Sequence, residues 1–184
     1  MNFIRKYKIE IFIFSLAVLA RVFLFYINFE AEGGNLINTI HGDDGYYELS
    51  KNILAGHGLS GSAVPPYAPN PLRTPIYPGF IALILYLFGS YWAVLSYQVL
   101  VGSAIPVLGS RIALSLTNTK NVALLVGIAM AFEPYLVLFS SIFYTETLFI
   151  FLFLIFVLLF LSYLDKNSIF MLAMSAVILG LATL

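Results

Sequence analysis

The chain has 184 residues, of which 61% are hydrophobic and only 10% are charged. Soluble domains average about 45–50% apolar and about 25% charged residues, so a soluble globule of this composition would lack the polar groups to cover its surface. Nine basic and nine acidic residues balance each other, which excludes nucleic-acid binding driven by bulk charge. The absence of cysteine excludes a disulfide framework, a thiolate metal site and a cysteine nucleophile.

The charged residues are concentrated in the first 75 positions. From Ile76 to Leu184 only six occur, namely Arg111, Lys120, Glu133, Glu146, Asp165 and Lys166. A transmembrane helix needs about 20 apolar residues to cross about 30 Å of hydrocarbon, and long stretches of this part meet that need. We therefore expect an all-α integral membrane protein, a multi-span helical bundle.

The first span is expected over residues 9–29. Arg5, Lys6 and Lys8 precede it, as in a signal peptide, but the apolar stretch exceeds the usual ~7–15 residues and no small-residue cleavage site follows. We interpret it as a retained anchor. Its basic flank predicts a cytoplasmic N-terminus, so that residues 30–75 form a polar loop on the outer side.

The outer loop is too long to be without structure of its own. Residues 43–56 have the pattern of a short amphipathic helix, because Tyr46, Leu49 and Ile53 share one face. Asp44 is suited to cap its N-terminus and Gly56 to end it. A helix of this kind next to an anchor is expected to lie along the membrane surface.

Residues 76–88 are apolar but too few to cross, so we expect a short interfacial or re-entrant helix there. The other expected spans are 91–116, 122–143 (broken near Glu133-Pro134), 144–164 and 169–184. With this count the turns that carry Lys120 and Lys166, which we call the basic joints, lie on the cytoplasmic side, in agreement with the positive-inside rule. Because the last apolar segment has no polar flank, we expect 1–184 to be a single transmembrane module from the N-terminal part of a longer protein.

The same count brings the acidic residues to the outer face. Asp43 and Asp44 are adjacent in the outer loop, and Glu133 and Glu146 interrupt apolar sequence, where a carboxylate is costly. Each has two interpretations. The carboxylates either cap helices or reach the headgroups, or they line a site in which one of them acts as general base on an acceptor hydroxyl or amine.

The cations allow two interpretations as well. Arg73 lies near the end of the outer loop and is suited to bind a lipid phosphate, or else it extends to the interface. Arg21 lies deep in the first span, so we expect it to pair with an outer-face carboxylate or a lipid phosphate, or to extend toward the outer face. His41 and His57 are interpreted as loop residues, with a metal site as the alternative.

Several ordered stretches resemble one family. They are Asp43-Asp44-Gly45-Tyr46-Tyr47, then residues 52–60, then Arg73-Thr74-Pro75-Ile76-Tyr77-Pro78-Gly79-Phe80 and Leu87-Phe88-Gly89, and later Glu133-Pro134 followed by residues 144–149. In this order they are similar to the N-terminal part of bacterial polyprenyl-phosphate-dependent glycosyltransferases of the GT-C fold, relatives of protein mannosyltransferases and lipid A aminoarabinose transferases.

The resemblance implies an inverting sugar transfer at the outer face of the cell (inner) membrane. The donor would be a polyprenyl-phosphate-linked sugar, and the acceptor a lipid, glycan or protein; no nucleic acid is expected. Asp43, with Asp44 where the family usually has Glu, would supply the catalytic base. Glu146 would help to bind a substrate head group, Arg73 would approach the carrier phosphate, and Tyr47 and Glu133 complete the expected substrate-binding set. No cofactor is expected, and a divalent metal is left open.

Two other function classes fit the same sequence. A transporter or flippase segment would use Glu133 and Arg21 as coupling residues near the bilayer centre. A structural subunit would have no chemistry, so that removing the Asp43 carboxylate would leave any associated activity intact. The depth of the acidic residues in the membrane distinguishes a transferase from a transporter. A transferase has its acids at the outer face beside a loop helix, whereas a transporter has them near the bilayer centre.

Overall fold

The computed structural model describes residues 7–41 and 45–184. Within these ranges the chain is helical, with a single isolated bridge between Ser60 and Pro69 in place of any strand. The helices are α2 (Lys8–Ala31), α3 (Leu36–Ile40), α4 (Tyr46–Leu54), α5 (Ile76–Phe88), α6 (Tyr91–Thr117), α7 (Lys120–Ala131), α8 (Pro134–Leu138), α9 (Glu146–Lys166) and α10 (Ile169–Thr183).

Three of these helices, α2, α6 and α9, are long and apolar enough to cross a membrane. They coincide with the expected spans over 9–29, 91–116 and 144–164. The expected spans over 122–143 and 169–184 are not among them, because α7 has 12 residues and α10 has 15. The fold is that of a helical membrane protein, with three helices of spanning length in the described ranges.

The prediction of one broken span over 122–143 is wrong beyond the break. Helix α7 ends at Ala131, α8 adds only Pro134–Leu138, and residues 139–145 are not helical. Pro134 begins α8 at a position where its missing N–H costs nothing. The chain therefore reaches α9 through an irregular segment, and the backbone groups of that segment need partners within the protein.

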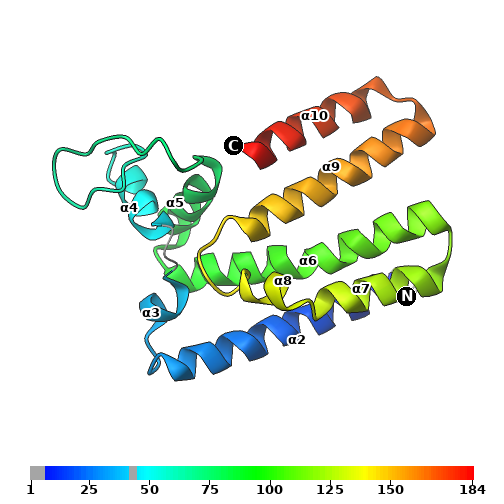
Figure 1. Ribbon diagram of the computed structural model, residues 1–184, viewed down its shortest axis with the longest axis horizontal. Coiled ribbons are helices and arrows are strands. Elements are labelled where there is room, and N and C mark those ends of the chain that lie inside the picture. Colours follow the sequence, from blue (N-terminus) through cyan, green and yellow to red (C-terminus); the bar gives the residue numbers. More distant parts are fainter. Residues whose placement is uncertain (1–6, 42–44) are drawn as a thin grey trace.

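The helices run roughly side by side, and the molecule has two distinct ends (Figure 1). At one end, which we call the loop end, lie α3, α4, α5 and the segment that leads into α9. At the other, which we call the turn end, lie the start of α2, the α6–α7 turn and the α9–α10 turn. Lys8, Lys120 and Lys166 occupy these helix termini, so the basic joints share one end, as the crossing count predicts.

The short helix predicted over 76–88 is present as α5 and lies at the loop end against α4. Gly89 ends it with a φ of +64°, a left-handed conformation that favours glycine. The amphipathic helix is present as α4, with Tyr46 and Leu49 buried. Its apolar face packs on α5. The two short helices form one unit with the beginning of α6, which shares their core.

Candidate functional site

The loop end is built around a continuous apolar core. Ile40, Leu49, Ile81, Val94 and Phe143 are almost completely buried there and come from α3, α4, α5, α6 and the segment before α9. Burying such side chains contributes about 1.5–3 kcal/mol each. This core holds the outer-loop helices against the start of α9. It therefore brings the outer loop and the first turn of α9, the two segments from which the predicted site residues come, to the same end.

The predicted catalytic residues Asp43 and Asp44 lie outside the described residues. The chain on both sides of them belongs to the loop end, because His41 follows α3 and Gly45 precedes α4. The N-cap of α4 is Gly45, with a φ of +75°, so the prediction that Asp44 occupies the cap position is wrong. A left-handed residue at this point turns the chain sharply into α4, and glycine adopts that conformation at no steric cost. Gly56 follows the helix with a φ of +79°, as expected for its end.

Tyr47, a predicted substrate-binding residue, is half-buried on α4 among aromatic and basic side chains. Its ring centroid lies 5.1 Å from that of Tyr91 and 5.8 Å from that of His41, while Lys51 Nζ lies 4.9 Å from it. Lys51 also pairs with Glu48 at 3.4 Å on the same helix. The Tyr47 ring is thus part of a mixed aromatic and charged surface beside the Asp43–Asp44 segment.

Arg73 lies over the ring of Tyr46, at 5.4 Å between the guanidinium carbon and the ring centroid. Tyr46 in turn meets Tyr77 edge to face, with ring centroids 4.9 Å apart. The half-buried Arg73 is therefore held at the loop end by a cation–π contact. The structure thus places this predicted phosphate-binding residue beside α4, the helix that follows the acidic pair.

Glu146 is the first residue of α9 and reaches the same end. Its Oε2 atom is buried, and within the described ranges it has no hydrogen-bond partner; the hydroxyl of Thr147 is in the same condition. Burial raises the pKa of the Tyr77 phenol well above its ordinary value, and nearby Tyr46 and Glu146 add to this effect. Glu146 therefore lies near the Tyr46–Tyr77 pair with one carboxylate oxygen left for another partner.

Gln98 and Tyr77 organise the irregular segment before α9, and the sequence did not single them out. The amide of Gln98 donates to the carbonyl of Phe139 at 2.9 Å and to that of Ile142, and its oxygen accepts from the Tyr77 hydroxyl at 2.7 Å. Both side chains are almost fully buried. The one sequence signal for Gln98 was a primary amide within an apolar helix, a position that calls for a partner.

Glu133 lies at the other end of α8 from this segment. It is the N-cap residue of α8, and its Oε2 accepts a 2.6 Å hydrogen bond from the amide of Leu136. The capping interpretation of Glu133 is therefore confirmed. No hydrogen bond or ion pair connects it to Glu146 in the part of the chain that the structure describes, so the structure does not join these two predicted substrate-binding residues.

Arg21 is bound by uncharged groups of the protein. It is fully buried, and its guanidinium donates to the Ser140 hydroxyl at 3.1 Å and to the carbonyls of Ala17 and Leu136 at 3.1 and 3.3 Å. No carboxylate among residues 7–41 and 45–184 pairs with it. The expected pairing with a carboxylate is therefore wrong, because backbone carbonyls and the Ser140 hydroxyl within the protein are the partners of the guanidinium.

The histidines are packed on tyrosine rings. His57 stacks on Tyr67 with ring centroids 3.6 Å apart, and His41 lies against Tyr47. Among residues 7–41 and 45–184, no three histidine, aspartate or glutamate side chains lie close enough together to hold a metal ion.

Protein-family models, curated proteins and solved structures were compared with this chain, and none matched it. What the described residues offer is a buried carboxylate oxygen, a guanidinium and tyrosine rings at one end of a helical bundle, beside the segment that carries two further carboxylates.

Proposed function

We propose that the chain is a membrane-bound glycosyltransferase, or the catalytic part of one, that moves a sugar from a polyprenyl-phosphate carrier to an acceptor at the loop end. The observation that supports this most directly is that Arg73 and Glu146, 73 positions apart in the sequence, come to the same pair of tyrosines: Arg73 lies over the Tyr46 ring, and Glu146 is near enough to Tyr77 to raise the pKa of its phenol. The Asp43–Asp44 segment lies between α3 and α4, in the same group of elements.

The proposed chemistry assigns one role to each group. The Asp43 carboxylate accepts the proton of an acceptor hydroxyl or amine while that oxygen or nitrogen attacks the anomeric carbon of the sugar. The bond between the sugar and the carrier phosphate breaks, and the polyprenyl phosphate leaves with its electron pair. Arg73 binds the phosphate, because a planar guanidinium matches phosphate oxygens. Glu146 accepts hydrogen bonds from sugar or acceptor hydroxyls through its unpartnered oxygen.

The membrane setting suits this substrate. A polyprenyl carrier places its phosphate at the membrane boundary and its chain in the hydrocarbon, and the loop end carries the polar groups while α2, α6 and α9 extend from it. The site would then open outward from the cell membrane, since the turn end carries the basic joints.

A transporter segment has less support. Its coupling residues would be Arg21 and Glu133, and both already have hydrogen-bond partners that stabilise α8. A coupling residue must exchange its partners during transport, whereas these two groups satisfy the ends of one short helix.

The test uses the full chain reconstituted in liposomes, polyprenyl phosphates that carry glucose, mannose or aminoarabinose, and a membrane extract that supplies lipid, glycan and protein acceptors. We expect release of the free polyprenyl phosphate with one of these donors and its loss in Asp43→Asn. Asp165→Asn, an exposed acid at the end of α9, is the matched control and should keep full release. Arg73→Ala should weaken carrier binding, measured by native mass spectrometry, more than it slows release from bound carrier.

Two results would overturn the proposal. One is normal release by Asp43→Asn, which would remove the general base. The other is that the unaltered chain neither binds polyprenyl phosphate nor releases it from any of the three donors, which would favour a non-catalytic membrane subunit.

A further inference from the structure

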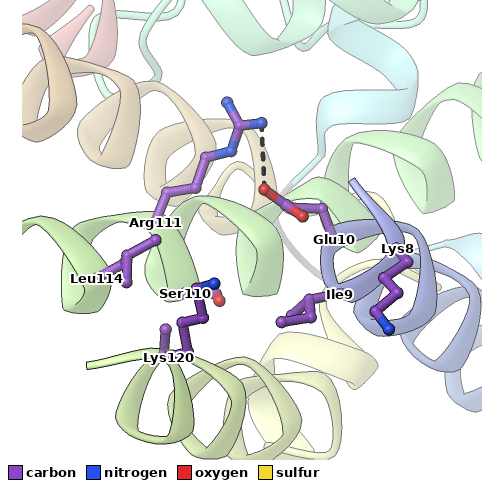
Figure 2. A pocket seen from close by; sticks show the side chains of 8 residues that line it. Lys8, Ile9, Glu10, Ser110, Arg111, Leu114 and Lys120 are labelled. Carbon is purple, nitrogen blue, oxygen red and sulfur yellow. Dashed lines mark ion pairs between the residues drawn. The ribbon is translucent and has the colours of Figure 1, made fainter. Parts of the chain in front are cut away.

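A second polar cavity lies at the turn end, away from the proposed transferase site. It has a volume of about 170 Å³ and lies between the first turn of α2, the last part of α6 and the first turn of α7. Figure 2 shows its lining side chains, with the Arg111–Glu10 ion pair joining α6 to α2. Nothing in the proposed sugar transfer uses this cavity.

The cavity has an excess of positive charge. Lys8, Arg111 and Lys120 line it together with a single carboxylate, that of Glu10, which leaves a net charge of +2. Glu10 pairs with Arg111 at 3.5 Å. Within the described chain, no carboxylate lies within ion-pair distance of either lysine. The cavity is therefore suited to an anion and unsuited to a metal ion.

The first turns of α2 and α7 and the polar residue Ser110 also line the cavity. Helices α2 and α7 begin at Lys8 and Lys120 without a side-chain cap, so the amides of their first turns lack an intrahelical or capping acceptor. Ser110 is only 3% exposed and contributes its side chain to the wall of the cavity.

An apolar groove adjoins this cavity at Glu10. It has a volume of about 270 Å³, lies between α2 and α6, and is lined, apart from Glu10, by Ile11, Phe14, Ala104, Val107 and Leu108. Both α2 and α6 are long and apolar enough to span a membrane, so the groove between them is suited to an acyl chain of a surrounding lipid. A free phosphate ion would fill only the polar cavity, whereas a phospholipid would fill both spaces.

We propose that the turn end binds an anionic phospholipid, with its phosphate in the cavity formed by Lys8, Arg111 and Lys120 and an acyl chain in the groove between α2 and α6. Basic pockets between transmembrane helices bind the head groups of anionic lipids in this way. The Glu10 carboxylate pairs with Arg111 and offsets part of the positive charge of the cavity. The bound lipid would connect α2, α6 and α7 at the end where the helices have no loop core.

The test measures binding of the first phosphatidylglycerol molecule to the full chain in detergent micelles by native mass spectrometry. Each lysine near a membrane surface contributes about a factor of five in affinity for anionic lipid, so the double variant K8Q/K120Q should bind about 25-fold more weakly. Lys166→Gln is the matched control, because Lys166 lies at the same end but does not line the cavity. Glu10→Gln removes the one carboxylate that lines the cavity, so this variant should bind phosphatidylglycerol more tightly than the unaltered chain.

Helix content by circular dichroism and elution volume show which variants are folded, and Glu10→Gln keeps the test decisive if K8Q/K120Q does not fold. The proposal is supported if K8Q/K120Q weakens binding while K166Q does not, if phosphatidylcholine binds more weakly than phosphatidylglycerol, and if millimolar inorganic phosphate does not displace the lipid. It is overturned if K166Q weakens binding as much as K8Q/K120Q, if Glu10→Gln weakens binding, or if inorganic phosphate displaces the lipid, which would indicate a site for free phosphate.

Discussion

The backbone amide of Phe143 donates a hydrogen bond of 2.9 Å to the carbonyl of Ile40. Phe143 belongs to the segment that leads into α9, and Ile40 is the last residue of α3. This bond joins the part of the chain that carries Glu146 to the part that carries the Asp43–Asp44 pair. The proposed transferase site depends on this connection between segments far apart in the sequence.

The first prediction concerns the shape of the Arg21 side chain. Its three hydrogen bonds come from three nitrogens of the planar guanidinium, each directed at a different acceptor. The Ser140 hydroxyl also donates to the Leu136 carbonyl at 2.7 Å. Arg21→Met removes the buried charge and leaves those two groups paired, so we expect a change of less than about 1 kcal/mol. Arg21→Lys keeps the charge with fewer donors in place and should lower the free energy of unfolding by about 1.5–3 kcal/mol.

Unfolding in mixed micelles with increasing sodium dodecyl sulfate measures both Arg21 variants. Arg111→Gln is the control, since the Arg111–Glu10 pair is partly exposed and should contribute about 0–1 kcal/mol. A larger loss in Arg21→Met than in Arg21→Lys would contradict the hydrogen-bond argument and show that the charge itself stabilises the fold.

The second prediction concerns the close approach of α6 to residues of α2 and of the segment after α8 at Gly102. A Cβ atom there would lie 2.2 Å from Ser140 Oγ and 3.0 Å from Arg21 Nε. Gly102→Ala should therefore lower stability by about 1–3 kcal/mol, because the neighbouring side chains must move. Gly180→Ala in α10 meets no atom within 4 Å and should be neutral or stabilising by about 0.5–1 kcal/mol. Thermal unfolding of both variants measures the difference, and equal melting temperatures would contradict it.

The third prediction concerns the cap of α8. Glu133→Ala removes the acceptor of the Leu136 amide and should destabilise the protein by about 0.5–2 kcal/mol. Glu133→Asp keeps a capping carboxylate and should recover most of that loss. Hydrogen exchange of the Leu136 amide measures the local effect, and equally slow exchange in Glu133→Ala and the unaltered chain would show that another group caps the helix.

The fourth prediction separates Glu146 from Glu133. The buried Oε2 of Glu146 has no partner in the described chain, so removing its charge removes a desolvation cost. Glu146→Gln should leave stability unchanged or raise it by up to about 1 kcal/mol while lowering sugar transfer. Chemical unfolding and the polyprenyl-phosphate release assay give the two readouts. A loss of stability with normal release would assign Glu146 a structural role.

From the sequence alone, the positions of α2, α5, α6 and α9 and the break at Glu133-Pro134 were predictable, because hydropathy and helix breakers act over a few neighbouring residues. The basic joints predicted which helix termini share one end. The tertiary structure alone decided the partners of Arg21, the role of Gln98 and the contact of Phe143 with Ile40. The bonds of Arg21 to Ser140, of Gln98 to Phe139 and of Phe143 to Ile40 each join residues at least 41 positions apart, and which backbone carbonyl becomes available depends on where α8 ends and how the helices pack around it.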